Sequence, residues 1–149
     1  MSMFADLLRG LLAPDPQRLS DPDARLALAA LLVRIARVDG DYTDAEINRI
    51  DRILCRRYAL SPFDAIELRH RAEDLEAQAP DTVRFTRAIK EAVDYDHRQG
   101  VIEAFWEVVL ADGIRDGEED SLLRLIANLL GVNDRDSNLA RQRVETRLK

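Results

Sequence analysis

Two short stretches of the sequence concentrate acidic residues in the same order. Residues 39–46 read D-G-D-Y-T-D-A-E, and residues 112–119 read D-G-I-R-D-G-E-E. Each opens with Asp-Gly and ends with Glu, and residue 112 repeats residue 39 at an offset of 73 positions. Several carboxylates within one bend can supply the hard oxygen ligands that Ca²⁺ and Mg²⁺ require. Any function predicted from this sequence must account for these two acidic bends.

Much of this acidity has a structural explanation in helix capping. The letters T-D-A-E at residues 43–46 fit a capping box, in which Thr and Glu each accept a backbone N–H. The letters D-G-E-E at residues 116–119 form a variant with Asp as the cap. Carboxylates in a first turn are also stabilised by the helix dipole, by about 0.3–1 kcal/mol each. On this alternative the bends are only turns and helix caps, and the chain is a protein-interaction module.

The aspartate that opens each bend is not explained by capping. Asp39 and Asp112 are both expected at the C-terminal end of a helix, where the helix dipole disfavours negative charge. The glycine that follows suits a left-handed residue that reverses the chain. An aspartate there, beside free helix-end carbonyls and facing a glutamate on the next helix, gathers oxygen donors for a divalent cation. The spacing is not that of an EF-hand, which has Gly at position 6 and Glu at position 12.

Other catalytic or metal-binding motifs are missing from the sequence. His70 and His97 are isolated and lack the H-x-x-x-H or H-E-x-x-H spacing of a zinc site. Cys55, the only cysteine, is expected to be a half-buried structural residue. No G-x-S-x-G, P-loop or G-x-G-x-x-G element occurs. We therefore expect a protein that is not an enzyme.

Composition narrows the class of protein further. The chain has 149 residues, a net charge of −6 and 46% hydrophobic residues, as expected of one globular domain. The acidic balance argues against a nucleic-acid partner, whose phosphates need a basic surface. A single cysteine fits a reducing compartment. The N-terminal sequence makes a poor signal peptide. No apolar run approaches the roughly 20 residues of a transmembrane helix. We expect a cytoplasmic protein with no transmembrane segment.

Apolar spacing predicts an all-α fold of about seven to eight helices, because no segment alternates with period 2. The predicted helices that follow the N-terminal region span residues 23–38, 44–58, 62–78, 81–93, 97–111, 117–130 and 135–147. Two helix-bend-helix hairpins, related by internal duplication, are expected to pack as one compact bundle. Helix 97–111 has the most large apolar residues and is expected at the centre. Helix 62–78 has a less regular apolar face of Phe63, Ile66 and Leu68.

The N-terminal region, residues 1–22, is predicted to be a short helix and a Pro-rich linker, ahead of a helical domain at 23–149. The helix has one apolar face, made of Phe4, Leu7, Leu8, Leu11 and Leu12. We expect this face to dock on the core or on a second subunit, the latter giving a homodimer. The alternative, a helix that binds a membrane surface or a partner, is less favoured because a Lys/Arg-rich polar face is missing.

Two segments resemble the TerB-like family, named for a tellurite-resistance protein. They are F-W-E-V-V-L-A-D-G-I-R-D-G-E-E-D-S-L-L-R-L-I-A-N-L-L-G-V at 105–132 and L-V-R-I-A-R-V-D-G-D-Y-T-D-A-E at 32–46. The resemblance implies paired helical hairpins, an acidic site that chelates metal, and no catalytic activity. It also implies a role in tellurite and other chemical stress, in phage or colicin resistance, and in stress-response complexes near the membrane.

Carried over by position, the resemblance implies four metal ligands: Asp39, Glu46, Asp112 and Glu119. The first copy departs from the family pattern, because Val38 replaces a small alanine and Ala45 stands where the second copy has Glu118. The second bend is therefore the better candidate. The leading hypothesis is a non-enzymatic TerB-like stress-response module that binds a divalent cation, Ca²⁺ or Mg²⁺, or a protein partner through its acidic bends.

Overall fold

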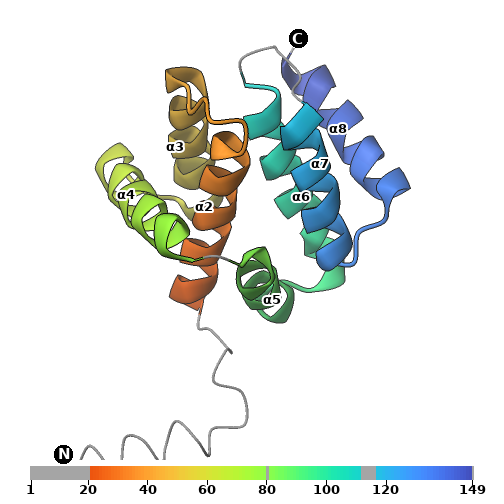
Figure 1. Ribbon diagram of the computed structural model, residues 1–149, viewed down its shortest axis with the longest axis horizontal. Helices are drawn as coiled ribbons and strands as arrows, with labels where there is room; N and C mark the ends of the chain where they lie inside the picture. The colour runs from red at the N-terminus through yellow and green to blue at the C-terminus, as the bar shows by residue number, and fades with distance from the viewer. Residues whose placement is uncertain (1–20, 80, 112–116, 149) are drawn as a thin grey trace, which may run out of the picture.

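The computed structural model describes residues 21–79, 81–111 and 117–148, and within these ranges the chain is all-helical (Figure 1). The helices are α2 (Asp21–Arg37), α3 (Asp44–Tyr58), α4 (Pro62–Gln78), α5 (Thr82–Ala92), α6 (Tyr95–Val109), α7 (Gly117–Leu129) and α8 (Asp134–Leu148). These seven helices confirm the predicted all-α fold. The helix predicted near Phe4–Leu12 lies outside the described residues. No described helix has the length and apolarity needed to cross a membrane.

The two predicted hairpins are α2–α3 and α6–α7, and each has a third helix packed against it. Helix α4 packs on α2 and α3, whereas α8 packs on α6 and α7. Figure 1 shows these two three-helix groups side by side, with α5 crossing below them. Helix α5 contacts both α2 and α7 and so links the groups. The result is one bundle with a shared core.

The centre of the bundle is α2, so the prediction that helix 97–111 is central was wrong. Helix α2 packs on α3, α4, α5, α6 and α7, whereas α6 lacks α4 and α5 among its main neighbours. The buried residues of α2 include four large apolar side chains and several alanines between them: Ala27, Leu28, Ala29, Ala30, Leu31, Leu32, Ile35 and Ala36. Small side chains let neighbouring helices approach α2 from every side, which a count of large apolar residues does not reveal.

The predicted apolar face of α4 was also wrong. Phe63 is 76% exposed and Ile66 is 38% exposed, while α4 instead buries Ala65, Arg69 and Ala72. The two alanines permit close packing on α2. Arg69 is tolerated in the interior because carboxylates neutralise it, as described below.

Candidate functional site

The first acidic bend connects α2 to α3 and is closed by its own hydrogen bonds. Gly40 has φ +83°, the left-handed conformation predicted for it, and its N–H donates to the Arg37 carbonyl at 2.9 Å. The N–H of Asp41 donates to Oδ1 of Asp39 at 2.9 Å. This Asx-type turn gives Asp39 a structural role that capping alone did not suggest.

The predicted capping box at the start of α3 is present. The N–H of Glu46 donates to the Thr43 hydroxyl at 3.1 Å, and the N–H of Thr43 donates to Oε1 of Glu46 at 3.0 Å. Glu46 is only 1% exposed. Its other oxygen, Oε2, is buried and has no hydrogen-bond partner among the described residues. Capping therefore accounts for one carboxylate oxygen and leaves a second, buried oxygen unexplained.

A polar network that includes two residues of α4, Arg69 and Glu73, contacts this bend. The Tyr42 hydroxyl donates to Oε2 of Glu73 at 2.7 Å, and Arg69 pairs with the same oxygen at 3.0 Å. Arg69 also pairs with Asp51 of α3 at 2.6 Å. The guanidinium of Arg37, at the end of α2, lies 4.9 Å from the centre of the Tyr42 ring. The network thus ties the bend to α2, α3 and α4.

The pKa values of this network fit its hydrogen bonds. Burial, and then the hydrogen bond to Glu73, raise the pKa of Tyr42 well above its usual range. Burial by itself would raise the pKa of Glu73, but hydrogen bonds from Tyr42 and Arg69 outweigh it, and the pKa is lowered. At neutral pH Tyr42 therefore remains a donor and Glu73 a charged acceptor. The sequence offered only the i,i+4 spacing of Arg69 and Glu73 as a sign of this network.

The second bend is described only from Gly117 onward. Asp112, the favoured ligand from the sequence, and Asp116 lie outside the described residues. Helix α7 begins at Gly117 and has three acids in its first turn, Glu118, Glu119 and Asp120. Glu119 is 2% exposed, as deeply buried as Glu46 at the matching place in the first hairpin. The two predicted glutamates therefore occupy equivalent buried positions.

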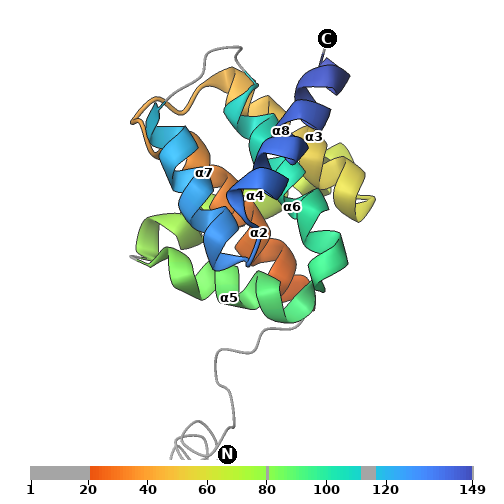
Figure 2. The same cartoon turned by 90° about the vertical axis from the view of Figure 1, so that its right-hand side faces the viewer.

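The first bend and the start of α7 meet at one groove. It measures about 760 Å³ and is lined by Val38, Asp39, Gly117, Glu118, Ser121, Leu122 and Leu125. Figure 2 shows the α2–α3 bend beside the beginning of α7 at one end of the bundle. Of the three predicted ligands that the structure describes, Asp39, Glu46 and Glu119, only Asp39 lines this groove. Glu118, which was not among the predicted ligands, contributes the second acid.

The described residues do not by themselves form a complete metal site. Within them, no three His, Cys, Asp or Glu side chains come together in a group that could hold an ion. Asp39 and Glu118 contribute two carboxylates at the groove, and Glu46 and Glu119 are buried in the first turns of α3 and α7. A cation at this groove would need further oxygen ligands, which water commonly supplies for Ca²⁺.

The chain is thus an all-α protein with two helical hairpins, each with a buried glutamate in the first turn of its second helix. A sequence model of the family described as tellurite resistance protein TerB matches residues 25–142. Because this match covers most of the chain, the protein belongs to the TerB family, which confirms the resemblance seen in the sequence. The comparison found no match among curated proteins or solved structures.

Proposed function

We propose that this chain is a non-enzymatic TerB-family module that acts in tellurite and chemical stress by binding a divalent cation. The site is the groove between the first acidic bend and the start of α7, and one ion is bound for each chain. Ca²⁺ is the favoured ion because its ligand geometry is flexible and accepts carboxylates, carbonyls and water together. The single cysteine supports a cytoplasmic setting for this activity.

The observation that supports this proposal is the convergence of Asp39 and Glu118 on one groove. These residues come from different repeats, so a shared site gives a reason for the acidic bend to occur twice. Carboxylates from both residues are hard oxygen ligands of the kind that Ca²⁺ and Mg²⁺ bind. The buried, unpartnered Oε2 of Glu46 adds an oxygen near this end of the bundle that capping does not explain.

A second candidate is an interaction module in which the bends are only turns and caps. It is favoured by the hydrogen bonds that occupy Oδ1 of Asp39 and Oε1 of Glu46. On this candidate, the acidic end would bind a basic surface of a protein partner.

Thermal unfolding in EDTA and then in Ca²⁺, Mg²⁺, Mn²⁺ or Zn²⁺ distinguishes the two candidates. An ion at 100 times its Kd should stabilise the chain by about 2.7 kcal/mol. Asp39→Asn, Glu118→Gln and Asp112→Asn should each reduce this shift. Asp96→Asn is the matched control, because Asp96 is in the first turn of α6, at the end of that helix away from the bend.

Two results would remove the cation proposal and leave the interaction module. One is the absence of a shift with every ion tested. The other is a shift in Asp39→Asn and Asp112→Asn that equals the shift in the wild type.

A further inference from the structure

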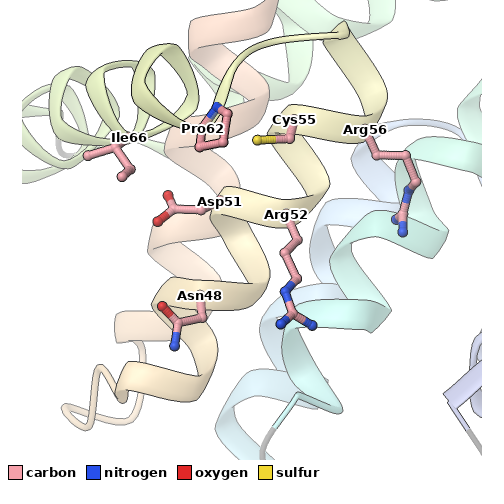
Figure 3. A pocket seen from close by; sticks show the side chains of 7 residues that line it. All are labelled: Asn48, Asp51, Arg52, Cys55, Arg56, Pro62 and Ile66. Atoms are coloured by element: carbon pink, nitrogen blue, oxygen red, sulfur yellow. The ribbon is translucent and has the colours of Figure 1, made fainter.

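A second groove, separate from the acidic end, lies between α3 and α4. It measures about 660 Å³ and is lined by Asn48, Asp51, Arg52, Cys55, Arg56, Pro62 and Ile66. Figure 3 shows the Cys55 side chain pointing from α3 toward Pro62, with Ile66 on the neighbouring turn of α4. The sulfur and these two apolar side chains form a hydrophobic strip between the two helices.

The apolar surface continues from this groove onto the outside of α4. Phe63 follows Pro62 directly and is 76% exposed, and Ile66 is 38% exposed. These two residues are three positions apart, so they share one side of the helix. An apolar groove continuous with exposed aromatic and aliphatic residues is typical of a surface that binds an amphipathic helix.

The sequence of residues 4–12 has the apolar spacing expected of such a helix. Phe4, Leu7, Leu8, Leu11 and Leu12 have the i, i+3, i+4, i+7, i+8 spacing of one apolar helix face. Residues 13–20 separate this segment from α2, which begins at Asp21. Eight extended residues reach at most about 26–29 Å.

The described part of the chain begins close to this groove. The guanidinium of Arg25, in the second turn of α2, lies 4.8 Å from the centre of the Tyr58 ring. Tyr58 is the last residue of α3 and follows Cys55 by three positions. The other groove with exposed apolar residues, at Val38 and Leu125, is at the far end of α2, about 25 Å away along the helix. The α3–α4 groove is therefore the one that the tether reaches most easily.

We propose that residues 4–12 dock in the α3–α4 groove of their own chain and cover Cys55, Phe63 and Ile66. The short tether favours the same chain over a second copy, because it holds the segment at an effective concentration of about a millimolar. Docking would bury apolar side chains on both surfaces, which is the main driving force for such contacts. A partner with a similar amphipathic helix would have to displace this segment to reach the groove.

Reactivity of the Cys55 thiol tests this proposal, because Cys55 is the only cysteine. In the full-length chain, the double variant Leu8→Asp/Leu11→Asp should increase the rate of reaction with DTNB at least fivefold. The control Arg9→Asp changes charge on the polar side of the same segment and should react at the wild-type rate. Far-UV circular dichroism and thermal unfolding establish that each variant is folded. Equal rates in the wild type and the double variant would overturn the proposal.

Disulfide formation provides an independent test. Leu8→Cys places a thiol on the apolar face, whereas Asp6→Cys places one on the opposite face at a similar distance along the chain. A disulfide requires the two Cα atoms to be about 4.4–6.8 Å apart. In a glutathione redox buffer, Leu8→Cys should form an intramolecular disulfide with Cys55 at least tenfold faster than Asp6→Cys. Equal rates, or disulfide-linked dimers from Leu8→Cys, would contradict docking within one chain.

Discussion

The two hairpins share a backbone plan but are supported in different ways. In both, a glutamate in the first turn of the second helix is almost completely buried, with Glu46 at 1% and Glu119 at 2% exposure. Behind the first hairpin, α4 contributes Arg69, whose side chain is 11% exposed and pairs with two carboxylates. Behind the second, the arginines of α8 that pair with α6 are far more exposed, 50% for Arg147.

The buried contacts of the second hairpin include the indole of Trp106. Trp106 is 4% exposed, and its Nε1 donates to the Ser137 hydroxyl of α8 at 3.2 Å. The buried glutamates thus occupy equivalent positions in the two hairpins, while the third helix of each group makes different contacts. At the first hairpin the buried partner in the ionic network is an arginine, whereas at the second it is Glu107 of α6, which pairs with the more exposed Arg56 and Arg147.

The largest effect on stability is expected when Arg69 is replaced. Arg69→Ala leaves Asp51 and Glu73 without their shared cation in a site that is mostly closed to water. We expect a loss of about 3 kcal/mol in the free energy of unfolding, measured with urea. The matched variant Arg143→Ala removes a more exposed arginine of α8, whose partner Glu103 also pairs with Arg147, and should cost less than about 1 kcal/mol. Similar losses in both variants would contradict the contrast between the two hairpins.

Trp106→Phe tests the support of the second hairpin. The change removes the donor to Ser137 and leaves a small cavity, so we expect a loss of about 2 kcal/mol in the free energy of unfolding. Ser137→Ala keeps the indole and isolates the hydrogen bond, at about 1 kcal/mol. A loss below about 0.5 kcal/mol for Trp106→Phe would show that the indole is not an important contact between α6 and α8.

Thr43→Ala tests the cap that the first bend provides. The variant loses the hydroxyl that accepts the Glu46 N–H, and we expect a loss of about 1 kcal/mol. Ser61→Ala removes the corresponding cap of α4, whose hydroxyl accepts the Asp64 N–H at 3.1 Å, and is the matched control. Because the buried Glu46 also loses a partner, Thr43→Ala should cost more than Ser61→Ala. The reverse order would mean that the capping box adds nothing beyond an ordinary cap.

The smallest effect is a change in acid stability. The folded-state pKa of Glu73 is lowered, so the stability that it contributes is present above its usual pKa of 4.5 and is lost as the pH falls through the folded-state value. Glu73→Gln should therefore flatten the dependence of unfolding free energy on pH below 4.5. Glu145→Gln, which removes a more exposed i,i+4 partner of Arg141, should leave that dependence nearly unchanged. If the unfolding free energy of Glu73→Gln and of the wild type changed with pH in the same way, Glu73 would not be the source of this acid sensitivity.

Local features of this fold were predictable from the sequence, because their signals lie within a few residues. The left-handed conformation of Gly40 and the capping box at Thr43 both occur as predicted. Features that depend on helix packing were not predictable. Neither the burial of Arg69 nor the exposure of Phe63 follows from the apolar spacing of α4, because both depend on where α2 and α3 lie.

The candidate site was also predictable from the sequence only in its local features. The aspartate-glycine bends were evident from the repeat, but the approach of Asp39 to Glu118 depends on how the two hairpins pack. The sequence suggested one site in each bend, with the second preferred. Because Asp39 and Glu118 line the same groove, we propose instead one shared site.

Isothermal titration of the full-length chain with Ca²⁺, after removal of metal with EDTA and dialysis, tests the shared site most directly. The account predicts one Ca²⁺ bound per chain, with affinity reduced at least tenfold by Asp39→Asn and also by Asp112→Asn, and unchanged by Asp96→Asn. Two ions per chain, each sensitive to one bend alone, would contradict a shared site, and no binding would contradict the cation proposal itself.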